Sequence, residues 1–486
     1  MERHVAWNVA HGLPWAAART PDKVAVREGA RAFTYRELNA RVNRLAHALG
    51  ALGLAPGDRL LVLLGDRLEH LEALFACAKV GVEVAPVDHR WRPDEVRHAV
   101  ALYQPRGALF EESTRALAPE GLDGPRICLE ADYEALLAKA DASEALQPVA
   151  SEAPFCIGST SGTSGLPKGI RLSHRSMRWR MPIYAFDFGF GPDDVWLSNT
   201  PIAHGGGRAF AMAIWIRGGT VLIDSDFDAE RTLATVARER VTACMTVPTM
   251  LTRLLAVPDL ERHDRSSLRC VISTGAPLPP SVRLDVLDRL TPSFYQFYSS
   301  TESGGITVLP PWRQRDRGDS VGTGVFGKEL RLEDDGEVLS RGPAVMAEYA
   351  GNPQATAAAF DGDWFRTGDL GRLDDEGLLY IVGRKKDMII SGGLNVYPAE
   401  VERVLYLHPA VQDAAVVGQP DAEWGEVVKA FVQLRAGQRA SEADIVEHCR
   451  AHMASYKKPR LVEFVAELPR TTNGKIARQQ LLGRGR

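Results

Sequence analysis

The sequence predicts an α/β protein with a large N-terminal domain of mostly parallel sheets covered by helices, a small β subdomain, and a small α+β C-terminal domain. At 486 residues the chain exceeds the size at which one hydrophobic core keeps growing. Short apolar runs alternate with segments of helical period through much of the chain. From about residue 321 the pattern changes to short β-prone pieces broken by glycine.

The first β and α elements are predicted in residues 35–87. Apolar residues recur at three- and four-residue steps, which predicts an amphipathic helix over 35–54: Leu38, Val42, Leu45, Leu49 and Leu52. Pro56 and Gly57 end this helix. The apolar runs 59–64 and 82–87 then flank a helical stretch at 70–80, which gives a strand-helix-strand unit.

The same alternation returns from residue 195. Strands are predicted at 196–199, 220–223, 242–246 and 269–273. Helices are predicted after Gly207, up to Arg240 and up to Ala256. Strands that alternate with helices in this way favour parallel pairing.

The last part of the chain is predicted to hold the β subdomain and a separate C-terminal domain. Turn signals at 335–336 and 376–377 separate short β-prone pieces, and a basic turn follows at 384–387. A segment of roughly a hundred residues then has its own helix and strand alternation, within the usual domain size. We therefore expect domains at 1–383 and 384–486, with a loop near 148–154.

Composition excludes several classes. The net charge is −4 and no basic run stands out, so a nucleic-acid partner is not expected. The six cysteines are far apart without a Cys-x-x-Cys pair, which favours reduced core residues over a zinc site or disulfides. The N-terminus lacks a signal-peptide core, and no apolar run is long enough for a transmembrane segment. We expect a cytoplasmic location.

Residues 159–169 place hydroxyls and glycines around Lys168. Glycine lets backbone N–H groups face an anion, hydroxyls add donors, and the lysine supplies a point charge. The segment is not a Walker A loop, because the Gly-Lys-Ser/Thr ending is absent. By itself the pattern fits a phosphate loop and a solvated polar turn about equally.

Several further motifs occur in a fixed order with this loop: Thr-Tyr-Arg-Glu-Leu-Asn at 34–39, Tyr-Ser-Ser-Thr-Glu at 298–302, Trp-Phe-Arg-Thr-Gly-Asp at 364–369 and Gly-Arg-Lys-Lys-Asp at 383–387. Together they resemble the motif set of the adenylate-forming superfamily, which includes acyl-CoA synthetases, nonribosomal-peptide adenylation domains and beetle luciferase. The resemblance runs from about residue 34 to residue 475.

The resemblance implies a nucleotide site. The residues that would bind ATP or AMP are Thr160, Ser161, Gly162, Thr163, Ser164, Gly165, Lys168, Gly275, Ala276, Pro277, Tyr298, Asp369 and Arg384. Tyr298 would stack on adenine, and Asp369 would accept the ribose hydroxyls. Thr301 would contact the α-phosphate and Glu302 would hold Mg²⁺. Ser299 departs from the family, where glycine usually follows the tyrosine, and its Cβ restricts the local backbone.

For the acid, the resemblance implies a pocket closed by His204, in the motif at 201–207, and lined by Thr274, Gly275 and Phe297. No aspartate occurs between residues 201 and 210 to pair with an ammonium group, which disfavours an α-amino acid. Arg208, one helical turn from His204, is expected to be an ordinary surface arginine rather than a contact to a second polar group of the substrate.

For the thiol, the resemblance implies a coenzyme A path along Gly392, Gly393 and Trp424, although Trp424 also fits a core role. Lys475 would be the catalytic lysine. The C-terminal domain would be mobile and swing about a hinge near Lys386.

These features together predict an ATP-dependent carboxylate:coenzyme A ligase that forms an acyl-adenylate and releases pyrophosphate and AMP. The substrates would be a small carboxylic acid, ATP with Mg²⁺, and coenzyme A. A stand-alone adenylation enzyme that loads a carrier protein is the first alternative, and a non-catalytic AMP-binding protein the second. Luciferase-like oxygenation is a remote third. The sequence does not identify the acid and leaves a homodimer open.

Overall fold

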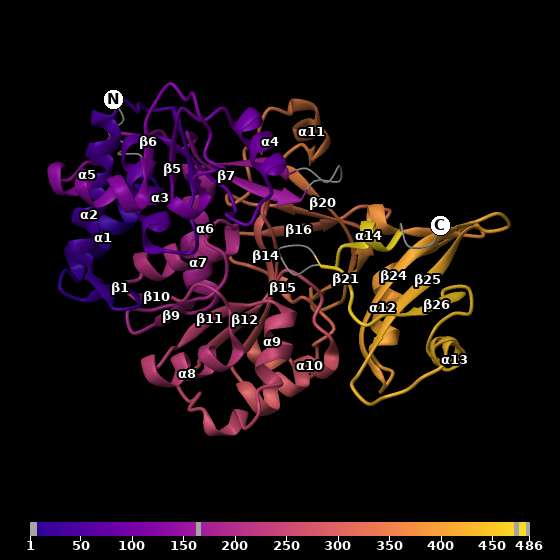
Figure 1. The fold of residues 1–486 in the computed structure, drawn as a ribbon. Coiled ribbons are helices and arrows are strands. Elements are labelled where there is room, and N and C mark those ends of the chain that lie inside the picture. Colours follow the sequence, from indigo (N-terminus) through magenta and orange to yellow (C-terminus); the bar gives the residue numbers. More distant parts are fainter. Residues whose placement is uncertain (1–6, 162–166, 471–475, 483–486) are drawn as a thin grey trace.

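The computed structural model describes residues 7–161, 167–470 and 476–482 (Figure 1). Its first sheet has seven strands in the order β18-β8-β7-β4-β3-β5-β6. These are β3 (Arg59–Leu63), β4 (Glu83–Pro86), β5 (Gly107–Phe110), β6 (Arg126–Cys128), β7 (Pro154–Ser161), β8 (Pro167–Ser173) and β18 (Glu348–Tyr349). Strands β3 to β7 pair in parallel, and β8 and β18 add an antiparallel edge.

The second sheet has nine strands in the order β15-β14-β13-β12-β11-β9-β10-β1-β2. These are β1 (Val24–Glu28), β2 (Arg31–Thr34), β9 (Val195–Ser198), β10 (Thr220–Ile223), β11 (Ala243–Thr246), β12 (Cys270–Ser273), β13 (Phe294–Ser300), β14 (Gly304–Leu309) and β15 (Thr323–Gly324). The six inner strands are parallel, as their alternation with helices predicts, and both edges are antiparallel.

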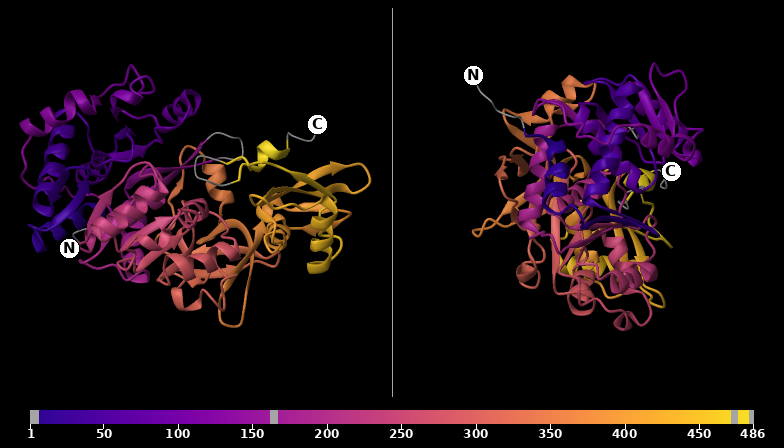
Figure 2. Two further views of the ribbon diagram at one scale, coloured as in Figure 1. Left: turned by 60° about the horizontal axis from the view of Figure 1, so that its bottom comes forward. Right: turned by 90° about the vertical axis from the view of Figure 1, so that its left-hand side faces the viewer.

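Helices fill the space between the two sheets and cover their outer faces (Figures 1 and 2). The helices that contribute to the shared core are α1 (Gly12–Arg19), α2 (Tyr35–Ala51), α3 (Leu68–Val80), α5 (Glu134–Lys139), α6 (His174–Asp187) and α7 (Gly205–Ile216). α4 (Pro93–Tyr103) packs on the far face of the seven-stranded sheet. α8 (Ala229–Glu239), α9 (Pro248–Leu255) and α10 (Pro280–Asp285) lie by the far face of the nine-stranded sheet.

Helix α2 shows how local sequence sets these boundaries. Thr34 caps it through a reciprocal pair of hydrogen bonds, in which Thr34 Oγ1 accepts from the Glu37 N–H and the Glu37 carboxylate accepts from the Thr34 N–H. The helix ends at Ala51, three residues before the predicted limit. The motif at 34–39 is thus the start of a helix.

A five-stranded antiparallel sheet forms the predicted β subdomain. Its strands are β16 (Glu329–Leu332), β17 (Glu337–Arg341), β19 (Phe360–Asp361), β20 (Trp364–Leu373) and β21 (Leu379–Arg384). The short helix α11 (Pro353–Ala358) precedes β19.

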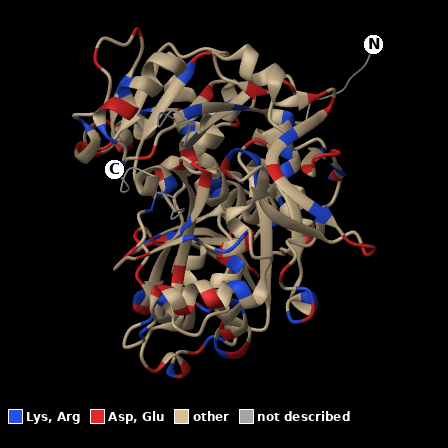
Figure 3. Cartoon of the chain, turned by 90° about the vertical axis from the view of Figure 1, so that its right-hand side faces the viewer, with Lys and Arg blue, Asp and Glu red and all other residues tan. Residues whose placement is uncertain are grey.

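The C-terminal segment has its own sheet and core and lies at one end of the molecule (Figures 1 and 2). Its strands are β22 (Ile389–Ser391), β23 (Leu394–Val396), β24 (Val411–Asp421), β25 (Gly425–Leu434) and β26 (Leu461–Phe464). Its helices are α12 (Pro398–Leu405), α13 (Glu442–His452) and α14 (Arg478–Leu482). The predicted α/β class is confirmed, whereas the boundary between residues 383 and 384 stays a prediction. Seen from this end, basic and acidic positions are interspersed along the ribbon (Figure 3).

All six cysteines are free and buried, as their spacing predicted. Among the described helices, none combines the length and the apolar character needed to cross a membrane.

Candidate active site

The predicted phosphate loop connects the antiparallel strands β7 and β8. Thr160 pairs with Lys168, and Ser161 pairs with Pro167. Gly162, Thr163, Ser164 and Gly165 lie outside the described residues. The ammonium group of Lys168 lies 5.5 Å from the ring centre of Tyr349 in β18. The hairpin therefore carries Lys168 to the edge where β18 joins the sheet.

Tyr349 also connects Lys168 to the predicted metal ligand. Its hydroxyl donates a 3.1 Å hydrogen bond to Glu302 Oε1. Burial, followed by the charge of Glu302, raises the pKa of Tyr349 above its ordinary value, so the hydroxyl keeps its proton. Two predicted phosphate-site residues that are far apart in sequence thus meet at one side chain that sequence reasoning missed.

The turn 301–303 joins β13 and β14 and sits against the base of the hairpin. A Cβ placed on Gly158 in β7 would lie 2.7 Å from Thr301 Cγ2, so only glycine allows this approach. Buried cations also bind the turn: Arg180 donates to the Thr301 carbonyl at 2.9 Å, and Lys328 donates to the Ser303 carbonyl at 2.9 Å. Sequence reasoning missed both cations, because arginine and lysine alone give no signal of burial.

Three predicted nucleotide residues form one cluster. Tyr298 OH donates to Asp369 Oδ2 at 2.5 Å, and Arg384 Nε lies 2.8 Å from Asp369 Oδ1. β20 and β21 bring the two charged residues together, because Asp369 pairs with Arg384 in register. In this arrangement both carboxylate oxygens of Asp369 face donors, as they would face two ribose hydroxyls.

The residues predicted beside adenine follow β12, the neighbour of β13 in the sheet. Gly275 has φ +90°, a conformation that favours glycine. Thr274 and Ser299 share a 3.2 Å hydrogen bond between hydroxyls, and the β13–β14 register shifts between Tyr298 and Ser299. Ser299, the departure from the family pattern, therefore binds Thr274, a predicted pocket residue. Ala276 and Pro277 follow in the loop between β12 and α10.

His204 stands at the start of α7 and is held by a carboxylate. Its Nε2 lies 2.9 Å from Asp88 Oδ2, while Arg90 Nη2 lies 2.6 Å from the same carboxylate. Burial by itself would raise the pKa of Asp88, but hydrogen bonds from Arg90 and His204 outweigh it and hold the pKa below the usual range. With Nε2–H donating to Asp88, Nδ1 of a neutral His204 is left as an acceptor.

The glycines after His204 serve backbone packing. A Cβ on Gly207 would lie 2.3 Å from the Pro201 carbonyl oxygen, and one on Gly206 would lie 2.8 Å from Met245 Cε. The N–H of Ile202 donates to Asp66 at 2.6 Å. Asp66 and Asp88 thus tie this loop to the carboxyl ends of β3 and β4.

The expectation for Arg208 is wrong. Its side chain is fully buried, with Nη1 donating to the Ala203 carbonyl and with Nε and Nη2 lacking a partner among the described residues. α7 packs between the two sheets, so a position one turn into it cannot reach the surface. Phe297, predicted to line the acid pocket, is 5% exposed and packs edge-on against Tyr184, Phe188 and Phe210.

The predicted coenzyme A residues also meet. Gly392 donates its N–H to the Trp424 carbonyl at 2.9 Å, and a Cβ on Gly392 would lie 2.6 Å from the Trp424 ring. The guanidinium of Arg460 lies 4.0 Å from the centre of this ring. Gly393 follows Gly392 in the β22–β23 turn, and both have positive φ. Trp424 is half-buried between glycine and arginine rather than in the core.

Lys475 lies outside the described residues, which resume at Ile476 with a bridge to Arg470. Lys386 is exposed in a short turn directly after β21. Its neighbour Lys385 pairs with Asp335 and Glu337 of the β subdomain.

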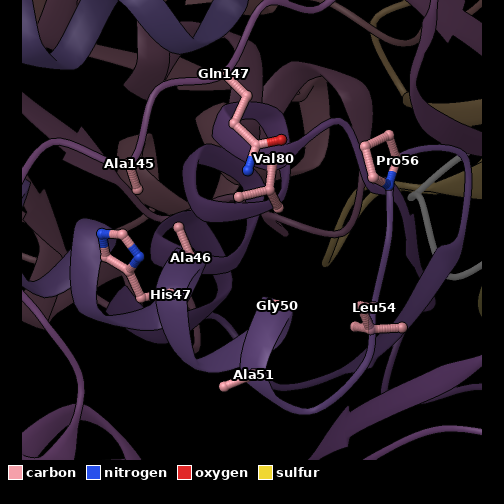
Figure 4. Close-up of a pocket in the computed structure, with 9 residues that line it drawn as sticks. All are labelled: Ala46, His47, Gly50, Ala51, Leu54, Pro56, Val80, Ala145 and Gln147. Carbon is pink, nitrogen blue, oxygen red and sulfur yellow. The ribbon is translucent and has the colours of Figure 1, made fainter.

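A cavity of about 260 Å³ lies beside α2, where Gln147 and His47 point into it (Figure 4). An open groove of about 930 Å³ is lined by residues of α1, α6 and α7, among them Trp15 and Phe186. Neither contains a predicted site residue.

Comparison with known proteins bears on these clusters. A family model described as AMP-binding enzyme matches residues 13–350, and one described as AMP-binding enzyme C-terminal domain matches residues 400–475. The chain is 36% identical to feruloyl-CoA synthase of Amycolatopsis sp over 477 residues, 96% of each chain. It is 36% identical to fatty acid–acyl-carrier-protein ligase ScoC of Streptomyces coeruleorubidus, over 96% of this chain and 94% of the other. The structure of o-succinylbenzoate CoA synthetase (MenE) from Bacillus subtilis with the acyl-adenylate intermediate OSB-AMP has a TM-score of 0.85, 30% identity and 97% coverage of both chains.

Proposed function

The chain belongs to the family of AMP-binding enzymes, and from this membership we propose that it is an ATP-dependent carboxylate:coenzyme A ligase that acts through an acyl-adenylate. The carboxylate of the acid attacks the α-phosphorus of ATP and pyrophosphate leaves. The thiol then attacks the acyl carbon and AMP leaves. One observation carries the proposal: Lys168 and Glu302 both contact Tyr349. Glu302 lies on the turn 301–303, which directly follows β13, and Tyr298 of β13 belongs to the Tyr298–Asp369–Arg384 cluster.

The first half-reaction needs no enzymatic nucleophile. Lys168 and the loop at 159–169 bind the leaving phosphates, Thr301 donates to the α-phosphate, and Lys475 bridges carboxylate and phosphate. His204, held by Asp88, closes the acid pocket beside Thr274, Gly275 and Phe297.

Mg²⁺ fits this arrangement through Glu302. The described residues contain no cluster of three or more His, Cys, Asp or Glu side chains that could hold a metal. Mg²⁺ in phosphoryl-transfer sites takes one or two carboxylates and completes its shell with substrate phosphates and water. The ion supplies charge neutralisation to the triphosphate, and a single carboxylate at the turn is enough to hold it there.

For the second half-reaction we propose that residues 384–486 rotate about Lys386. The rotation withdraws Lys475 and brings Gly392, Gly393 and Trp424 to the thiol path. The exposed basic turn after β21 and the separate hydrophobic core of the C-terminal segment support this division at residues 383 and 384. The six free, buried cysteines support a cytoplasmic location, where thiols stay reduced.

The products test the reaction class. With a reactive acid, Mg-ATP and coenzyme A, the protein forms AMP, pyrophosphate and a thioester. A screen of pyrophosphate release over aliphatic and aromatic acids identifies the acid. Formation of ADP would overturn the proposal, because attack at the γ-phosphorus leaves ADP.

The similarity to a ligase named for acyl-carrier protein supports a second candidate, transfer to a carrier-bound thiol. Coenzyme A and a phosphopantetheinylated carrier, offered at equal concentration to the adenylated enzyme, distinguish the two acceptors. Faster thioester formation on the carrier would favour this candidate.

A further inference from the structure

The turn 301–303 rests on buried positive charge. Arg180 in α6 donates through Nη2 to the carbonyl oxygens of Thr301 and Glu302, at 2.9 and 3.2 Å. Lys328 donates to the next carbonyl, that of Ser303, and to the Ser303 hydroxyl at 3.0 Å. Three successive carbonyl groups of the turn therefore face cations.

A third cation, Arg208, approaches from α7. Its Nη2 lies 3.3 Å from the position that a Cβ on Gly158 would occupy, and Thr301 Cγ2 lies 2.7 Å from that same position. Arg180, Lys328 and Arg208 are 2%, 9% and 0% exposed. We call these three residues the cationic cluster.

None of the three cations forms an ion pair with a carboxylate in the described part of the chain, whereas the buried Lys79 does, with Glu144. Buried charges are ordinarily paired, because removing a charge from water is costly. Burial, reinforced by the charge of Arg180, lowers the pKa of Lys328 to about 7. Burying these three cations therefore costs free energy, and a nearby anion would reduce that cost.

We propose that the cationic cluster is the electrostatic support of the polyphosphate site, and that its charge is balanced when a nucleotide triphosphate binds at the turn 301–303. The inference rests on the proposed function, which places the α-phosphate at Thr301 and Mg²⁺ at Glu302. Because all three cations are buried, they act through the turn and through their field, as positioning residues rather than as phosphate contacts.

A purely mechanical brace would need hydrogen bonds but no charge, and Lys328 separates the two roles. Lys328→Gln keeps an N–H donor and removes the charge, Lys328→Met removes both, and Lys328→Arg keeps the charge. Kd is measured at pH 6, below the pKa of Lys328, for Mg-ATP and for adenosine, which has the base and ribose but no phosphate. Circular dichroism shows whether each variant is folded.

We therefore expect Kd for Mg-ATP to rise about tenfold in both Lys328→Gln and Lys328→Met, which corresponds to one missing unit charge about 12 Å from a unit of opposite charge at an effective dielectric of about 20. Lys328→Arg stays within about threefold of the wild type, and Kd for adenosine is unchanged throughout. Lys79→Met is the matched control, because Lys79 is also buried but pairs with Glu144. In this variant the ratio of Kd for Mg-ATP to Kd for adenosine should not change.

If the wild type binds Mg-ATP and Lys328→Gln binds it with nearly the same Kd, the inference is overturned, because an N–H donor alone is then sufficient. If Lys328→Met does not fold, the comparison of Lys328→Gln with Lys328→Arg still decides. Failure of the wild type to bind Mg-ATP would count against the proposed function itself.

Discussion

The link between Asp88 and His204 gives a quantitative prediction for the acid site. Asp88 uses both oxygens as acceptors: Oδ1 accepts from the Arg90 N–H and Nε, and Oδ2 accepts from Arg90 Nη2 and His204 Nε2. In Asp88→Asn an amide NH₂ replaces one oxygen, and in either orientation of the amide this NH₂ faces a donor. The variant therefore loses hydrogen bonds as well as charge.

The expected size follows from these contacts. A hydrogen bond to a charged group contributes about 1.5–3 kcal/mol. The side chains of His204 and Arg90 are 20% and 40% exposed, so water replaces part of the loss and the lower end applies. About 1.5 kcal/mol corresponds to a decrease of roughly tenfold in kcat/KM for the acid.

The assay is initial-rate pyrophosphate release at varied acid concentration and saturating Mg-ATP. Asp58→Asn is the control, because Asp58 also pairs with an arginine, Arg106, but precedes β3 at the other end of the sheet. The decisive comparison is between His204→Ala and the double variant His204→Ala/Asp88→Asn. In the His204→Ala background, Asp88→Asn should lower kcat/KM for the acid by less than about twofold. A further tenfold loss in the double variant would refute a role of Asp88 through His204.

Four further outcomes are expected. Glu302→Gln raises the Mg²⁺ concentration needed for half-maximal turnover, and an unchanged Mg²⁺ dependence would count against it as a ligand. Lys475→Ala lowers acid-dependent exchange of pyrophosphate into ATP by about a hundred- to a thousandfold, while thioester formation from supplied acyl-adenylate is spared; equal loss in both steps would contradict the rotation. Gly392→Ala drives a Cβ against the Trp424 ring and slows only the thiol step, so slowed adenylation would argue for general unfolding. Burial raises the pKa of Asp187 to about 6, so the fold loses stability as pH rises from about 4 to 6; Asp187→Asn should raise Tm at pH 8 but not at pH 4, and an equal gain at both would refute it.

Local patterns predicted most of the fold. The run 220–223 is β10, with the predicted limits, and the strands near 196, 243 and 270 differ from prediction by a residue or so at their ends. Their alternation with helices was enough to infer parallel pairing. The motifs also led to contacts between distant segments, because Asp369 meets Arg384 and Gly392 meets Trp424.

Residues whose role depends on tertiary packing could not be predicted. Asp88 follows β4 like many turn aspartates, and only the approach of α7 makes it the partner of His204. The prediction for Arg208 was wrong for the same reason, because nothing in its neighbouring residues shows that α7 is covered on all sides. Arg180, Lys328 and Tyr349 belong to no motif, and only the assembled turn gives them a role.

The burial of the cysteines has a chemical consequence for an enzyme that holds an activated acyl group. An acyl-adenylate is an electrophile that any accessible thiolate would attack, so the protein's own sulfur atoms compete with the intended acceptor. Burial raises the pKa of Cys244 to about 12 and that of Cys449 to about 11, which keeps these thiols protonated near neutral pH. With all six thiols inside the fold, the acyl group is protected from self-acylation. The same property makes the chain suitable for site-specific labelling, since one cysteine introduced on the surface would be the most accessible thiol to report the movement of the C-terminal segment.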